Sequence, residues 1–260
     1  MRFAVIVFLT LVAGSARAQQ SLFNVPSTQE TVKGRLFGQV QLTGTPHGGE
    51  VNTTIELGIL RWLEVGMNLF HMPLYRTSPM EDANATASSA TTVNANVWFD
   101  PASWFAIEIG GQGGVGFTPG SHLLEPVLFA WATARFDAPG RWGSYVVGGY
   151  TGTRGALGHG PPVGGLFGFE IPIWEHYIHA QGDWVIGLNA ISVAVVGVVV
   201  FIGKNFQLSL GGQLPSPGSG NAFGGVVELT YVPSHPTEDE GIGSPEDRPH
   251  RVRSDEKPEK

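Results

Sequence analysis

The sequence alternates apolar and polar residues over repeated short segments, and this period of two is the feature that most limits its fold. In residues 51–57, Val51, Ile55 and Leu57 fall on one face of an extended chain, and the polar residues between them fall mostly on the other. About twelve such segments follow one another between Lys33 and Tyr231, without the period of an amphipathic helix. The pattern predicts an all-β domain whose strands each have one apolar and one polar face.

The predicted strands have about ten residues each, the length of a tilted strand that crosses a bilayer. They fall at residues 33–42, 50–59, 64–74, 92–99, 105–116, 125–136, 143–151, 163–171, 177–187, 192–202, 206–213 and 222–232. The connections alternate in length: short at 61–62, 101–104, 138–142, 172–175 and 203–205, and mostly longer at 43–49, 75–91, 118–123, 152–162, 188–191 and 214–221. Outer-membrane barrels have short periplasmic turns and longer outer loops. We therefore expect an antiparallel up-and-down β-barrel in a bacterial outer membrane, with both termini in the periplasm.

The two ends of the sequence differ from this patterned region. Arg2, an apolar run over residues 3–13 and Ala16-Arg17-Ala18 have the form of a secretory signal, so residues 1–18 are predicted as a signal peptide. Residues 19–32 are expected to form a short polar lead in the periplasm, and residues 33–232 the barrel. Residues 233–260 are rich in proline and charged residues and have too few apolar ones to form a core, which predicts a disordered tail.

The composition favours a surface that faces lipid. Charged residues make up 14% of the chain, against roughly 25% in ordinary soluble domains, and there are 37 glycines. The absence of cysteine excludes a disulfide scaffold, a thiolate metal site and an anchor through a lipidated cysteine. A formal net charge of −7 argues against nucleic acid as a partner.

Aromatic residues lie at or beside the short connections, namely Trp62, Trp104, Trp142, Trp174 and Phe206. An aromatic girdle at a membrane interface would place them there, because an indole ring has an apolar body and a polar N–H. In the alternative architecture, a soluble β-sandwich, the same residues would only cap strand ends. The polar faces carry little charge and much Asn, Gln, Ser and Gly, which favours the barrel.

Several segments resemble a known family. Residues 60–69 (LRWLEVGMNL), 183–189 (DWVIGLN), 205–212 and 227–231 (VELTY) are similar to strands of the outer-membrane β-barrel transporter family of the phenol-degradation MetA type and its uncharacterised relatives. The resemblance implies a barrel and a transport role, without an established substrate. The chain departs from barrel proteins that end on an aromatic residue, because it continues past Tyr231. The signal for the barrel-assembly machinery would therefore be internal.

If the apolar faces contact lipid, the polar faces enclose a lumen. The candidate lumen-lining residues are Lys33, Arg35, Glu56, Asn68, Glu108, Glu125, Trp131, Arg135, Glu170, His179, Asp183 and Glu228. Acids outnumber bases on these faces, which predicts a preference for cations. Alternatively, the interior is plugged by carboxylates that pair with Lys33, Arg35 and Arg135. Phe129 and Trp131 share a face with Glu125 and Arg135 and would form a constriction if that face points inward.

We expect no catalytic, cofactor or metal site. His176 and His179 project to opposite faces of a strand and cannot share a metal, and His47, His122 and His159 are interpreted as solvent-facing loop residues. The glycines of residues 110–114 lack the lysine and helix of a phosphate loop, so they indicate curvature or close packing. The leading hypothesis is a passive channel or transporter component for an unknown small solute. The alternatives are a closed barrel that displays loops such as 75–91, and an outer-membrane lipid hydrolase with a Ser/His pair at the rim.

Overall fold

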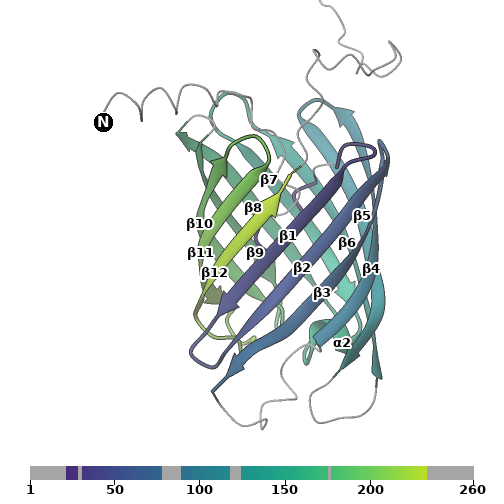
Figure 1. Ribbon diagram of the computed structural model, residues 1–260, viewed down its shortest axis with the longest axis vertical. Coiled ribbons are helices and arrows are strands. Elements are labelled where there is room, and N and C mark those ends of the chain that lie inside the picture. The colour runs from purple at the N-terminus through teal and green to yellow at the C-terminus, as the bar shows by residue number, and fades with distance from the viewer. Residues whose placement is uncertain (1–21, 29–30, 78–88, 118–123, 175–176, 233–260) are drawn as a thin grey trace, which may run out of the picture.

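The computed structural model describes residues 22–28, 31–77, 89–117, 124–174 and 177–232 (Figure 1). The predicted signal peptide and charged tail lie outside these ranges. The described chain forms one closed barrel of twelve antiparallel strands, which confirms the predicted all-β, up-and-down barrel. The strands are β1 (Leu36–Gly44), β2 (Gly48–Leu60), β3 (Leu63–Arg76), β4 (Ser89–Ala102), β5 (Phe105–Phe117), β6 (Leu124–Asp137), β7 (Ser144–Gly152), β8 (Val163–Trp174), β9 (Ile178–Ile186), β10 (Val193–Ile202), β11 (Phe206–Pro215) and β12 (Gly224–Tyr231).

The barrel closes where the first strand meets the last. Each strand pairs with its neighbours in the chain, and β1 pairs with β12 from Gly38 opposite Tyr231 to Gly44 opposite Gly225. We call this β1–β12 pairing the seam. Closure leaves no strand edge with unpaired backbone N–H and C=O groups, which is the requirement for a sheet surrounded by apolar solvent.

The two ends of the barrel differ in their connections. At the short-turn end lie the connections that join β2 to β3, β4 to β5, β6 to β7, β8 to β9 and β10 to β11, together with the start of β1 and the end of β12 (Figure 1, top). At the long-loop end lie the connections between the other consecutive strands, among them residues 45–47, 153–162, 187–192 and 216–223. The hairpin at 45–47 is shorter than predicted, because Gly48 and Gly49 extend β2 by pairing with Arg76 and Tyr75.

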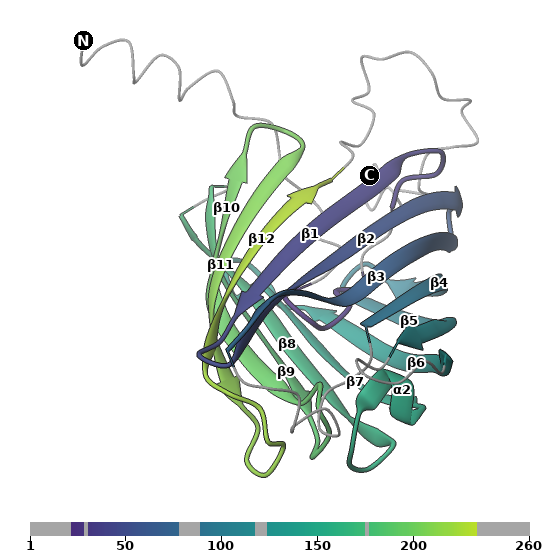
Figure 2. The same cartoon turned by 60° about the horizontal axis from the view of Figure 1, so that its bottom comes forward.

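One short helix, α2 (Arg154–Leu157), lies at the rim of the long-loop end (Figure 2). Its residue Leu157 is 1% exposed and packs into an apolar cluster inside the barrel. No helix was predicted in this region. Within the described residues, no helix is long and apolar enough to cross a bilayer.

The strands place their apolar side chains outside and their polar side chains inside. On β4, Val93 is 66% exposed, whereas its neighbours Thr92 and Asn94 are 1% and 8% exposed. This is the reverse of a soluble protein and excludes the β-sandwich, in which the apolar faces would be covered. The aromatic residues predicted to form a girdle are all exposed and lie at or next to the short-turn end: Trp62, Trp104, Trp142, Trp174 and Phe206.

The segment that precedes the barrel lies inside it. Residues 22–28, which we call the plug, have side chains that are almost fully enclosed: Leu22 is 2%, Phe23 3% and Val25 0% exposed. Leu22 and Val25 pack in a cluster with Trp131, Val146, Tyr150, Leu157, Leu166 and Val185, and Phe23 packs with Val193, Val195 and Val226. A polar lead in the periplasm was expected over residues 19–32, and for residues 22–28 the structure differs. The physical reason is that three large apolar side chains gain by leaving water.

Hydrogen bonds fix the backbone of the plug to the barrel wall. The backbone N–H of Asn24 donates to the carboxylate of Asp183, and that of Val25 donates to the same group at 2.8 Å. The side-chain amide of Gln41 donates to the carbonyl of Phe23 at 2.5 Å. The polar lumen therefore satisfies backbone groups that burial would otherwise leave without partners.

A candidate binding cavity in the barrel lumen

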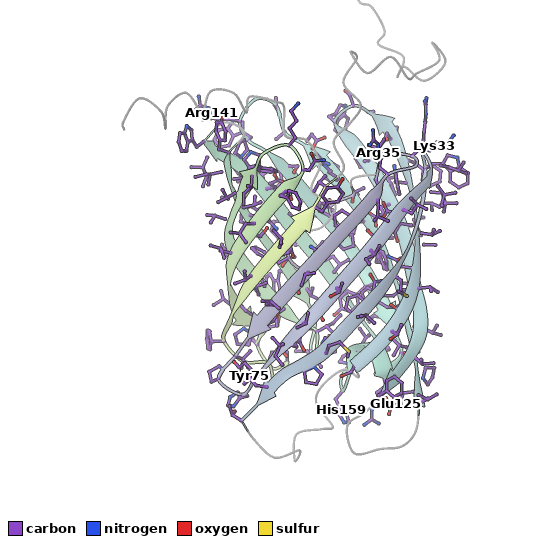
Figure 3. All side chains as sticks on the ribbon, viewed as in Figure 1. Lys33, Arg35, Tyr75, Glu125, Arg141 and His159 are labelled. Atoms are coloured by element: carbon purple, nitrogen blue, oxygen red, sulfur yellow. The ribbon has the colours of Figure 1, made fainter. Side chains whose placement is uncertain are left out.

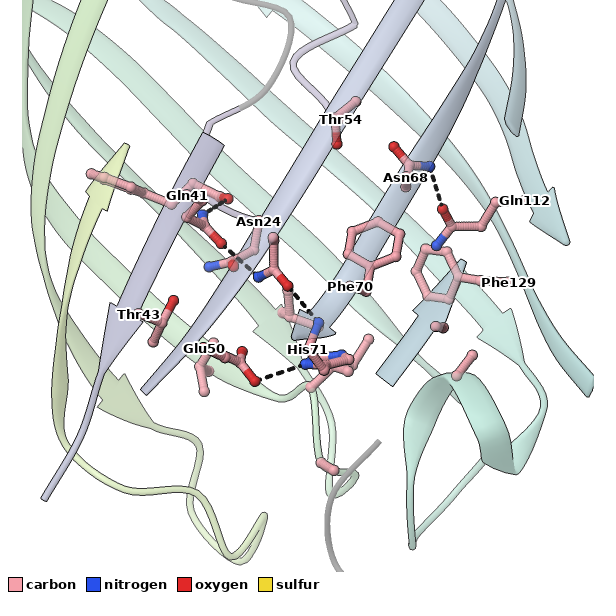
Figure 4. A pocket seen from close by; sticks show the side chains of 18 of the residues that line it. Asn24, Gln41, Thr43, Glu50, Thr54, Asn68, Phe70, His71, Gln112 and Phe129 are labelled. Carbon is pink, nitrogen blue, oxygen red and sulfur yellow. Dashed lines mark hydrogen bonds and ion pairs between the residues drawn. The ribbon is translucent and has the colours of Figure 1, made fainter. Parts of the chain in front are cut away.

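A cavity of about 730 Å³ occupies the part of the lumen that the plug leaves open. Phe23, Asn24 and Pro26 of the plug line one side of it, and inward-facing residues of β1 to β6 line most of the rest (Figure 4). The cavity reaches the long-loop end, where His47 and Tyr75 are among its lining residues. The plug and the apolar clusters fill the interior on the side of β7 to β11. We call this space the lumen cavity.

The strand register brings a row of polar residues together across β2 to β5. Glu56 lies opposite Gly66, Gly66 opposite Asn94, and Asn94 opposite Gln112. A Cβ atom on Gly66 would lie 2.4 Å from Asn94 Oδ1 and 2.5 Å from Glu56 Cγ. The glycine thus makes room for the Asn94 amide to donate across β3 to Glu56 Oε1 at 2.5 Å.

The adjacent row toward the short-turn end repeats the arrangement one step further around the barrel. Glu64 lies opposite Asn96, whose amide donates to Glu64 Oε1 at 3.3 Å. Asn96 lies opposite Gly110, and the ring of Trp131 covers that glycine so closely that a Cβ atom would be 2.3 Å from it. Trp131 Nε1 donates to Glu108 Oε1 at 2.8 Å. The predicted role of the 110–114 glycines in close packing is confirmed at Gly110.

These two rows form an acid-rich patch on the cavity wall. We define the acidic pocket as Glu56, Glu64, Glu108, Asn94 and Asn96, all of which are buried and line the lumen cavity. The cavity lining includes no lysine or arginine in the described part of the chain. Nor do the described residues contain a group of three His, Cys, Asp or Glu side chains placed to hold a metal ion.

A second polar network lies nearer the long-loop end (Figure 4). His71 Nδ1 and Glu50 Oε2 are 3.0 Å apart, and the backbone N–H of His71 donates to Asn52 Oδ1 at 2.8 Å. Asn52 in turn donates to Gln41 Oε1 at 3.0 Å. His71 has a φ of +53°, where the β2–β3 register shifts between Val51 and Thr53. The irregularity in β3 aims the His71 imidazole at Glu50.

The predicted lumen residues fall into three groups. Glu56, Asn68, Glu108 and Trp131 line the cavity. A second group faces the interior away from the cavity and contacts other residues there. Asp183 accepts hydrogen bonds from the plug, and Glu228 accepts them from Gln41 and Thr230. Glu170 pairs with His179 at 2.6 Å, and Arg135 pairs with Asp137 at 2.8 Å. The third group, Lys33, Arg35 and Glu125, lies toward the barrel rims (Figure 3).

Lys33 and Arg35 lie at the short-turn rim of the barrel for a local reason. Both are exposed and precede β1, which begins at Leu36 rather than at Lys33. Gly34 has a φ of +76°, and the N–H of Arg35 donates to the carbonyl of Val32 at 2.9 Å, so the chain turns here. The interior is therefore plugged in part, but by residues 22–28 and not by carboxylates paired with Lys33 and Arg35.

The inward face predicted for β6 is the one observed. Phe129 and Trp131 both line the cavity, with ring centroids 5.6 Å apart, whereas Leu128 is 54% exposed on the outer face. Glu50 and Glu64 were not among the predicted lumen residues. The same alternation could have found them, because Glu50 shares a face with Asn52 and Glu64 shares a face with Asn68.

The fold and the lumen cavity together define the class of this protein as an up-and-down β-barrel with an apolar exterior and a polar, partly open interior. Among solved structures, the chain is similar to a KdgM porin determined in complex with disordered oligogalacturonate, with a TM-score of 0.51 and 12% sequence identity over 75% of this chain and 98% of that one. At this identity the likeness establishes the shared barrel fold. No protein-family model matches the chain, and no curated protein matches it.

Proposed function

We propose that the protein is a bacterial outer-membrane barrel that acts as a passive channel or transporter component for small solutes. The observation that carries this proposal is a cavity of about 730 Å³ inside a closed barrel whose outer face is apolar. A polar lumen behind a lipid-facing wall is the arrangement of transmembrane β-barrels. In this orientation the short turns and both termini face the periplasm, and the bilayer and the barrel-assembly machinery are the protein's partners.

The charge of the cavity indicates which solutes would pass. Glu50, Glu56, Glu64 and Glu108 line it, and the described lining residues include no lysine or arginine. A low-dielectric channel with acidic groups favours cations. Oligogalacturonate, which the similar porin binds, is a chain of acidic sugars, so we propose a different solute class here. The resemblance to the outer-membrane transporter family of the phenol-degradation MetA type agrees with a transport role. We propose that the chain belongs to that family.

The plug controls how far the lumen is open. Residues 22–28 fill the interior beside β7 to β11 and border the cavity, so we infer that solutes enter from the long-loop end. Complete passage then requires either a route beside the plug or its displacement. Nothing in the described residues forms a recognisable catalytic group, and we propose a non-enzymatic role.

Conductance measurements test this proposal. The refolded protein in planar lipid bilayers should give discrete current steps, with a reversal potential in a KCl gradient that shows preference for K⁺. Glu108→Gln should reduce that preference, because Glu108 lies on the cavity wall. Glu170→Gln removes the same charge from a residue that pairs with His179 away from the cavity, and it should change the preference less.

Two results would contradict the proposal. A barrel that stays silent, both with and without residues 22–28, would indicate a closed structural or loop-displaying barrel. Hydrolysis of lipid by the same preparation would indicate an enzyme. Either result would leave the fold as described and remove the transport role.

A further inference from the structure

We propose that the short-turn rim, formed by the short connections and the start of β1, is a binding surface for the headgroups of anionic phospholipids. This surface requires a bilayer around the barrel, as in the proposed function, but it does not require that the lumen conducts. Two features of the rim support the assignment: the distribution of its exposed cations and the side chains that stand beside them.

Exposed cations lie around the whole short-turn rim. Arg61 lies in the connection from β2 to β3, Arg141 in that from β6 to β7, and Lys204 in that from β10 to β11. These connections are four strands apart in a barrel of twelve, so the three cations divide the rim into thirds. Lys33 and Arg35, which are also exposed, add to them at the start of β1 (Figure 3). A ring of cations matches a flat layer of negative charge, whereas a single protein segment would reach only part of it.

Acidic side chains do not balance these cations on the outside of the barrel. The described connections at the short-turn end contain no Asp or Glu. Two acids lie nearby, at the ends of β4 and β6: Asp100 is exposed, and Asp137 pairs with Arg135 at 2.8 Å. The described connections at the long-loop end contain one Lys or Arg, namely Arg154. The positive charge of the described connections is therefore concentrated at the short-turn rim.

The neighbouring aromatic side chains place two of these cations at the level of lipid headgroups. Arg61 precedes Trp62, which is 51% exposed, and Arg141 precedes Trp142, which is 67% exposed. Tryptophan rings of an aromatic girdle lie at the headgroup level of a bilayer. The adjacent guanidinium groups are then within reach of lipid phosphates, which a guanidinium binds through two parallel N–H donors. A lipid with net negative charge should be preferred to a zwitterionic one, in which a headgroup ammonium offsets the phosphate.

Native mass spectrometry of the refolded mature protein tests this surface by counting the lipids that the barrel retains. The probes are phosphatidylglycerol and phosphatidylcholine with the same acyl chains, offered together in equal amounts. The wild type should retain at least about fivefold more phosphatidylglycerol, because one basic residue near an anionic headgroup layer is sufficient for a preference of roughly that size. Raising the ionic strength from about 0.1 M to about 1 M should reduce the preference, since exposed charges are screened.

Variants at the two ends of the barrel locate the surface. Arg141→Gln and Lys204→Gln should each reduce the preference for phosphatidylglycerol by about threefold. Arg141→Lys keeps the positive charge and should keep most of the preference. Arg154→Gln, the matched control, removes one exposed cation from the long-loop end and should leave the preference unchanged.

Equal retention of the two lipids by the wild type would overturn the proposal. An equal loss of preference in Arg154→Gln and Arg141→Gln would also overturn it, because the effect would then come from the total charge of the protein. A preference that appears only after truncation behind Val232 would overturn it for the full chain. The partner of the rim would then be residues 233–247, which contain five Asp or Glu and no Lys or Arg.

The outcomes for the lipid surface and for the channel are independent. A silent barrel that prefers phosphatidylglycerol would support the surface and remove the transport role, and a conducting barrel without lipid preference would do the reverse. If a variant lacks the heat-modifiable migration of a folded barrel, the lipid preference of the wild type and its dependence on salt decide the question.

Discussion

Truncation of Phe23 to alanine should release the plug and open the lumen. The Phe23 ring is 3% exposed and packs against Val193, Val195 and Val226. Replacing a buried phenylalanine by alanine costs roughly 3–5 kcal/mol. This loss affects the docked plug and not the barrel, because the strand ladder closes through β1 and β12 without any contribution from residues 22–28. Since about 1.4 kcal/mol is a factor of ten, the ratio of docked to released plug should fall at least roughly 100-fold.

Single-channel recording would measure this change directly. The Phe23→Ala barrel should spend a larger fraction of time in its high-conductance state and have a higher mean conductance than the wild type. Asp183→Asn should act in the same direction, because a neutral amide oxygen accepts the hydrogen bonds from the backbone N–H groups of Asn24 and Val25 more weakly than the carboxylate does. Phe99→Ala is the matched control, since that ring is 55% exposed on the outer face.

Equal conductance and an equal open fraction in Phe23→Ala and the wild type, with both migrating as folded barrels, would refute this prediction. That result would show that the plug does not limit the path through the lumen. An increase in Phe99→Ala as large as that in Phe23→Ala would also refute it, because the effect would then come from general loosening of the barrel.

Two further predictions concern stability. Gly110→Ala should lower the urea midpoint of unfolding, because the new Cβ would lie 2.3 Å from the ring of Trp131, and the free energy of unfolding should fall by roughly 1–3 kcal/mol. Gly212→Ala is the control and should cause no loss of stability, because no atom lies within 4 Å of its Cβ position. Equal effects at the two positions would show that close packing at Gly110 is not the cause. Truncation after Val232 should leave a heat-modifiable barrel, because β12 ends at Tyr231 and the N–H of Val232 already donates to the carbonyl of Asn205 at 2.7 Å. Loss of folding in the truncated chain would show that residues 233–260 stabilise the barrel.

Much of the barrel was predictable because its strands obey a local rule. Alternation on β4 assigns Val93 to the outside and Asn94 and Asn96 to the lumen, and the structure agrees. The same rule identified Glu56 and Glu108 as lumen residues. The wall of a barrel has lipid on one side and the polar lumen on the other, so the polarity of a residue alone assigns its side chain to one of the two faces, and no knowledge of distant contacts is needed.

The plug and the acidic pocket depend on contacts that no local pattern encodes. Residues 22–28 have no alternation, and their burial depends on apolar side chains of β6 to β10, α2 and β12. The contact between Glu56 and Asn94 requires the strand register and also the absence of a side chain at Gly66, which lies between them. Lys33 and Arg35 lie at the rim, ahead of β1, because the chain turns at Gly34, and this turn also has no periodic signal.

The position of the plug in the chain has a consequence for how the barrel is assembled. The plug comes shortly before β1, and β1 forms the seam with β12, the last strand to be made. Pairing strands so far apart in sequence is slow relative to forming neighbouring hairpins. Until the seam forms, the inner face of the sheet is open, and residues 22–28 can pack directly against it. After the seam forms, the same segment would have to thread through an end of the barrel. Filling of the lumen before closure of the wall is thus the easier order, and a chain that closes first would have an open lumen until the segment enters through an end of the barrel.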